Sequence, residues 1–63
     1  MVLYNLYLVL NHETIKVYDN ATQRIVYEGS SKNIPDELMS ELVHDVTIAH
    51  EKDNITYFLI NIN

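Results

Sequence analysis

A chain of 63 residues without cysteine is expected to form one small domain, residues 1–63, that no disulfide bond or thiolate metal site can stabilise. Hydrophobic residues make up 48% of the chain, which is too many for a disordered protein, so stability must come from packing and from any second subunit. The formal net charge of -5 argues against direct binding to nucleic acid or to an anionic membrane, because both need a basic surface.

The first stretch, residues 2–10, is uncharged and almost wholly apolar. So short a run cannot be assigned by periodicity alone, but its leucine content and its spacing favour a helix. The residues at helical spacing are Leu3, Leu6, Tyr7 and Leu10. The run lacks the basic region of a secretory signal and is shorter than the roughly 20 apolar residues of a membrane helix. We therefore expect a soluble, cytosolic protein.

Two strands are predicted next, at residues 15–18 and 25–28, from their alternation of apolar and polar residues. In the second strand, Ile25 and Tyr27 should point to the same face. Residues 19–24 between the strands are rich in turn formers, which predicts an antiparallel hairpin.

Residues 35–42 are typical of an amphipathic helix. Pro35 suits a first helical turn, and Asp36 and Glu37 follow where acids complement the helix N-terminus. One arc of the helix would be apolar, with Ile34, Leu38, Met39 and Leu42. We expect this helix to lie on a sheet with its acidic side in water.

Two more strands complete the chain. Residues 43–51 alternate, which predicts a half-buried strand, and residues 51–54 form a polar turn. Residues 55–62 are apolar on both faces, as in a strand that is central or covered on both sides. The order αββαββ predicts an α+β domain with an antiparallel sheet.

Short motifs run through most of the chain: Leu10-Asn11-x-x-Thr14-Ile15-x-Val17-Tyr18-Asp19, Ile25-Val26-Tyr27-Glu28-Gly29 and Asn33-Ile34-Pro35-x-Glu37-Leu38. With the closing hairpin, they resemble a group of short uncharacterised proteins from phages and prophages of Gram-positive bacteria. The resemblance implies the topology above and a phage setting, where small proteins of the anti-CRISPR type inhibit host defence. In that group the first segment includes charged residues, where this chain has Tyr4, Tyr7 and Leu8.

Acidic residues concentrate in the second half of the chain. Six lie close together in sequence: Asp36, Glu37, Glu41, Asp45, Glu51 and Asp53. They form either a solvated surface that keeps the protein soluble or a surface matched to a basic partner. The hypothesis we carry forward is an inhibitor that occupies a basic, nucleic-acid-binding surface of a host protein.

The histidines are the only candidates for acid-base or metal chemistry near neutral pH. About 20 Å of strand would separate His44 from His50, which is too far for a shared metal ion. His12 has no evident third partner. The sequence therefore predicts no catalytic residue, metal or cofactor, and favours a non-enzymatic binding protein.

Five of the six aromatic residues are tyrosines, which are enriched at interfaces. Tyr4 and Leu8 would flank the buried stripe of the first helix. Either the tyrosine hydroxyls reach solvent from the rim of the core, or Tyr4, Tyr7 and Leu8 contact a target or a second copy. The alternative function is therefore a homodimeric structural or accessory phage protein.

Overall fold

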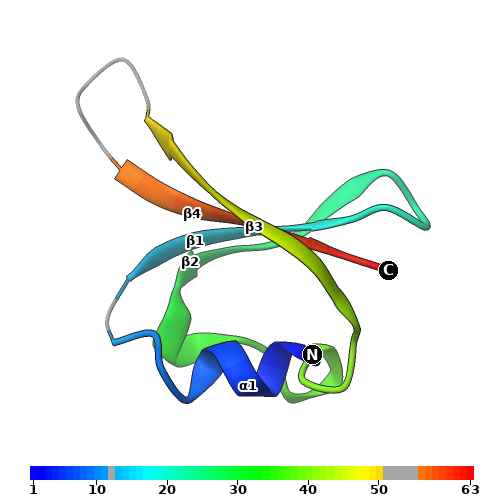
Figure 1. Ribbon diagram of the computed structural model, residues 1–63, viewed down its shortest axis with the longest axis horizontal. Helices are drawn as coiled ribbons and strands as arrows, with labels where there is room; N and C mark the ends of the chain where they lie inside the picture. The colour runs from blue at the N-terminus through cyan, green and yellow to red at the C-terminus, as the bar shows by residue number, and fades with distance from the viewer. Residues whose placement is uncertain (12, 51–55) are drawn as a thin grey trace.

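The computed structural model describes residues 1–11, 13–50 and 56–63, which form one twisted sheet with a short helix beneath it (Figure 1). The strands lie in the order β2-β1-β4-β3. We call the side of the sheet that bears the helix the core face, and the other side the open face. The elements are α1 (Leu3–Tyr7), β1 (Thr14–Asp19), β2 (Arg24–Ser30), the 3-10 helices η1 (Ser31–Asn33) and η2 (Asp36–Leu38), β3 (Val43–His50) and β4 (Thr56–Ile62).

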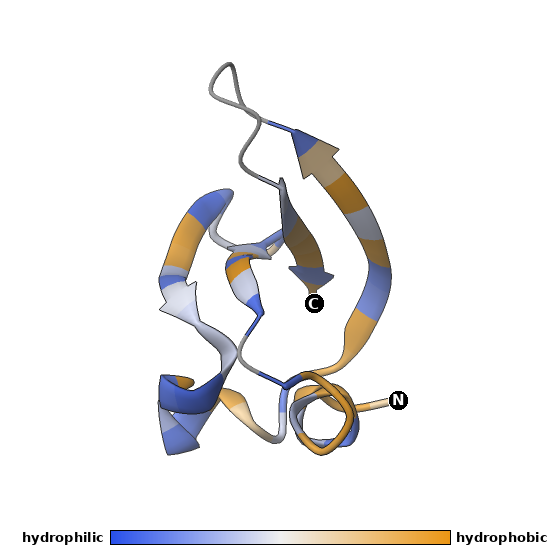
Figure 2. Ribbon diagram, turned by 90° about the vertical axis from the view of Figure 1, so that its left-hand side faces the viewer, coloured by the Kyte–Doolittle hydropathy of each residue, from blue (hydrophilic) through white to orange (hydrophobic). Residues whose placement is uncertain are grey.

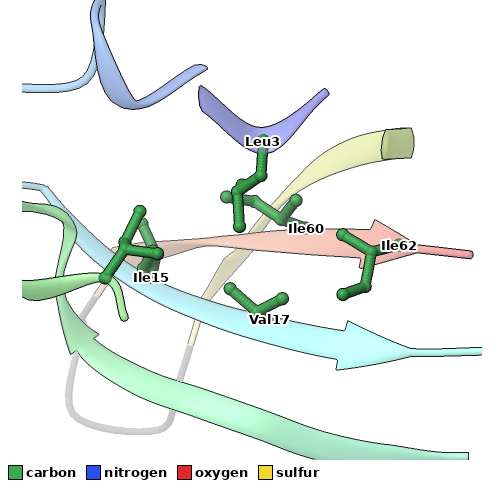
Figure 3. Close-up of a cluster of buried hydrophobic side chains, with 6 residues drawn as sticks. Leu3, Ile15, Val17, Ile60 and Ile62 are labelled. Atoms are coloured by element: carbon green, nitrogen blue, oxygen red, sulfur yellow. The ribbon is translucent and has the colours of Figure 1, made fainter. Parts of the chain in front are cut away.

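The core lies between α1 and the two central strands, β1 and β4 (Figure 3). Ile15 pairs with Phe58 and Val17 with Ile60, so the inward side chains of the two strands lie side by side. The buried apolar residues are Leu3, Ile15, Val17, Ile34, Ile60 and Ile62. The last strand is predicted to be central or covered on both sides, and the first of these placements is confirmed, because β4 has β1 on one side and β3 on the other.

The sheet is mixed, and the predicted antiparallel sheet and αββαββ order are wrong. Both hairpins form, β1 with β2 and β3 with β4, but β1 pairs with β4 in parallel. As a result β2 and β3 run in the same direction at opposite edges of the sheet. Residues 31–42 must then pass beneath the sheet from the end of β2 to the start of β3. A crossover between strands of the same direction needs about a dozen residues or more, which is the length of this segment.

The predicted amphipathic helix at residues 35–42 is also wrong, because this segment forms only the 3-10 helix η2 and a turn. In an α-helix the Met39 carbonyl would accept from the Val43 N–H. Instead it accepts from the Tyr4 N–H at 2.9 Å, while the Val43 N–H donates to the Met1 carbonyl at 2.9 Å. Ile34 is still buried, and Leu38 packs against the core, so the apolar pattern is satisfied without a helix.

The first stretch does contain a helix, although a shorter one than the predicted span of residues 2–10. Helix α1 has five residues, and the Leu10 N–H adds one more bond to the Leu6 carbonyl at 2.9 Å. The side chain of Asn5 accepts from the Val2 N–H at 3.0 Å at the start of the helix. Because so short a helix is not stable alone, its contacts with the sheet must hold it in place.

Strand β2 contains an irregularity that the alternation does not predict. Ile25 pairs with Tyr18 and Tyr27 with Val17, so Ile25 and Tyr27 face opposite sides of the sheet and the predicted shared face is wrong. Gly29 then adopts a φ of +143°. A side chain there would be strained, and its Cβ would lie 3.1 Å from the Tyr27 hydroxyl.

Candidate interaction surfaces

The acidic residues of the second half lie on three different elements. Asp36 and Glu37 are exposed in η2, and Glu41 is half-buried in the turn before β3. Asp45 is exposed on β3 and accepts a hydrogen bond from the side-chain amide of Asn61. The two remaining acids of the predicted binding face, Glu51 and Asp53, lie outside the described residues.

The sheet separates these acidic side chains rather than gathering them. Asp45 pairs with Asn61 on the open face, whereas η2 lies on the side of the sheet that bears α1 (Figure 1). Within residues 1–11, 13–50 and 56–63, the ion pair that forms is Lys16 with Glu28, at 3.8 Å. Asp36 and Glu37 therefore remain as a small exposed acidic patch in η2, and no cation of the described part of the chain forms an ion pair with it.

The outer side of α1 carries exposed apolar side chains at the predicted positions. Tyr4 is 48% exposed and Leu8 59% exposed, while Tyr7 packs against the core. The rings of Tyr4 and Tyr7 stack with their centroids 6.1 Å apart. The ring of Tyr7 therefore packs against the ring of Tyr4. Tyr4 and Leu8 form the surface that is available to a partner.

A hollow of about 490 Å³ opens beside the end of α1. Its lining residues are Tyr7, Leu8, Leu10, Asn11, Lys32 and Asn33. Next to it, the buried hydroxyl of Ser31 accepts from the Glu13 N–H at 3.1 Å and donates to the Leu10 carbonyl at 3.5 Å. Among the described lining residues, Lys32 carries a charge, and none of them has a carboxylate or an imidazole.

The open face of the sheet is organised around Lys16. Its ammonium group lies near the Glu28 carboxylate and 4.5 Å from the centroid of the Tyr57 ring. The ion pair and the cation-π contact hold the lysine over the middle of the sheet. This positive charge is therefore already engaged within the chain.

His44 and His50 lie near opposite ends of β3 and are not brought together. His50 hydrogen-bonds through Nδ1 to the hydroxyl of Thr56 at 3.1 Å, and His44 is exposed at a register irregularity near the start of β3. Among the residues that the structure describes, no group of three possible metal ligands occurs. His12 lies outside the described residues.

Sequence reasoning missed the exposed edge of the sheet at β3. Val46 pairs with Ile60 and Ile48 with Phe58, so both point to the core face, yet Val46 is 40% and Ile48 59% exposed. Figure 2 shows apolar segments along β3 as it arches away from α1. The alternation at residues 43–51 predicted the strand but not its position at the edge of the sheet.

Comparison with protein-family models, curated proteins and solved structures finds no match to this chain. In the part of the chain that the structure describes, no helix has the length and apolar character needed to cross a membrane.

Proposed function

We propose that the protein is a small, non-enzymatic binding module of phage origin that acts in the host cytosol. It occupies a basic, nucleic-acid-binding surface of a host protein and thereby inhibits that protein, in the manner of anti-CRISPR and other anti-defence proteins. The phage origin rests on the sequence motifs, and the binding mode rests on charge.

The observation that carries the proposal is the acidic patch of Asp36 and Glu37. Both residues are exposed and are neighbours in sequence, and neither forms an ion pair with a described residue. A basic surface would provide their countercharges, accelerate association and compete with nucleic acid for the same site. Interactions of this kind weaken as salt is added.

The test uses capture from the lysate of a Gram-positive host at low and high salt, followed by competition with duplex DNA. We expect the variant Asp36→Asn with Glu37→Gln to bind the captured protein at least tenfold more weakly and with a smaller salt dependence. The matched control is Glu13→Gln with Glu28→Gln, which changes the net charge equally but leaves the patch intact. Equal binding by both double variants, or capture that is insensitive to DNA, would count against the proposal.

The second candidate function is a self-associating structural or accessory protein. It is favoured by the exposed apolar side chains of Tyr4 and Leu8 on α1. Replacing both with serine should change the free energy of unfolding by less than about 1 kcal/mol, because exposed positions contribute little to stability. If this surface joins two copies, sedimentation of the double variant shows a monomer under conditions in which the unmodified chain is dimeric.

A further inference from the structure

Strand β3 forms one edge of the sheet, and on its outer side the described part of the chain pairs only with its beginning. The Val43 N–H donates to the Met1 carbonyl at 2.9 Å, and Val2 forms a bridge with Leu42. Beyond that point, from residue 44 to residue 50, no described strand pairs with the outer side of β3. We call residues 44–50 the β3 edge.

The two edges of the sheet differ in how well they discourage pairing with another chain. The β2 edge carries charges at Arg24 and Glu28 and an irregular register, which are features that protect exposed strands. The β3 edge has a single carboxylate, Asp45, followed by the β-branched residues 46–48. It is therefore the edge that can accept a further strand.

We propose that the β3 edge pairs in antiparallel fashion with the β3 edge of a second copy, with Thr47 facing Thr47 of that copy on a twofold axis. The two sheets then form one continuous sheet in which both core faces lie on the same side. This proposal is independent of the proposed function.

The register follows from which residues can face one another. Centring the pair on Thr47 sets Val46 against Ile48 of the other copy on the core face, so both exposed apolar side chains gain an apolar neighbour. If Val46 lay on the axis, Ile48 would face His44 of the other copy. If Ile48 lay on the axis, Val46 would face His50 of the other copy.

Charge is compatible with the same register. With Thr47 on the axis, Asp45 faces Ala49 of the second copy, so the only carboxylates of the β3 edge do not meet. Like charges directly opposite each other would destabilise the pair. The β3 edge is thus complementary to itself in its apolar positions, and its carboxylates do not oppose each other.

The interface contains one short strand from each copy, which is less than the roughly 1,200–2,000 Å² buried in stable complexes. We therefore expect a dimer that forms at high micromolar concentration and dissociates on dilution. Sedimentation equilibrium up to about 1 mM measures this directly, and a chain that remains monomeric throughout that range would overturn the proposal.

Cysteine cross-linking tests the register, since the chain has no cysteine of its own. Thr47→Cys should oxidise to a covalent dimer, because residues facing each other across an antiparallel pair lie within disulfide reach. The matched control is Ala49→Cys, on the same strand and the same face. In the proposed register, position 49 of one copy and position 49 of the other are offset by four residues, or about 13 Å, so this variant should not cross-link. Equal cross-linking of the two variants would overturn the register.

Charge substitutions at the axis provide the second test. Thr47→Lys and Thr47→Glu should each lower the dimer association constant at least fivefold, and a mixture of the two should restore association. Thr22→Lys, the same substitution in an exposed turn, should leave association unchanged. Heteronuclear NMR spectra establish that each variant is folded. Dimers that persist with lysine at position 47, or that disappear when Tyr4 and Leu8 become serine, would contradict the β3 pairing.

Discussion

Replacing Ile60 with alanine is expected to destabilise the fold by about 2–5 kcal/mol, the range found for large core side chains. Ile60 is fully buried between Val17 and Val46 on the central strand β4. At roughly 0.05–0.15 kcal/mol per residue, a domain of this size has only about 3–9 kcal/mol of stability. The variant should therefore lose a large part of the stability of the fold, as measured by urea denaturation followed by far-ultraviolet circular dichroism.

The matched control for this prediction is Ile25→Ala, because Ile25 is the same residue type on a strand but is 48% exposed. We expect it to cost less than about 1 kcal/mol. Comparable losses for the two variants would show that β4 does not supply the centre of the core.

The second large effect is expected for Leu3→Ala, at about 2–5 kcal/mol. Leu3 is the fully buried side chain of α1 and lies in the core (Figure 3), where partly buried Leu6 and Tyr7 pack against the same cluster. A helix of five residues is not stable without such a contact. Hydrogen exchange should show that the Leu10 amide loses protection well before the amides of β4 do.

Leu8→Ala provides the comparison, since Leu8 lies on the same helical segment but is 59% exposed. Its effect on the free energy of unfolding should be within about 0.5 kcal/mol. If α1 keeps its amide protection in Leu3→Ala, the helix is held by its backbone bonds to residues 39–43 rather than by its side chain.

The local structure was largely predictable from the sequence. Alternation located the four strands to within one or two residues, and the apolar character of both faces placed β4 in the middle of the sheet. These properties depend on neighbouring residues along the chain, and so they are visible in the sequence itself. The helical spacing of Leu3, Leu6 and Tyr7 likewise predicted which side of α1 is buried.

The arrangement of the hairpins was not predictable in the same way. Whether β1 meets β4 or another strand depends on the path of residues 31–42, which leaves no periodic signal. The failed helix at residues 35–42 has the same origin, because the carbonyls of Met39 and Glu41 bond to Tyr4 and Leu3, some 35 residues earlier in the chain. Local propensity was overridden by distant backbone partners.

The candidate surfaces likewise differ in whether they depend on local sequence or on strand order. The exposure of Tyr4 and Leu8 followed from helical spacing, and the exposure of Asp36 and Glu37 followed from their charge. The separation of Asp45 from η2 and the open β3 edge depend on strand order, which the sequence does not encode locally. A surface assembled from several strands therefore needs the structure before it can be described.

The parallel pairing of β1 with β4 also governs when the protein can fold during its synthesis. β1 and β2 can pair as soon as both have left the ribosome, since they are close in sequence. The core cannot close then, because Ile60 and Ile62 belong to a segment translated more than 40 residues after Ile15 and Val17. Until that segment emerges, the apolar side of the first hairpin stays exposed to water and to chaperones.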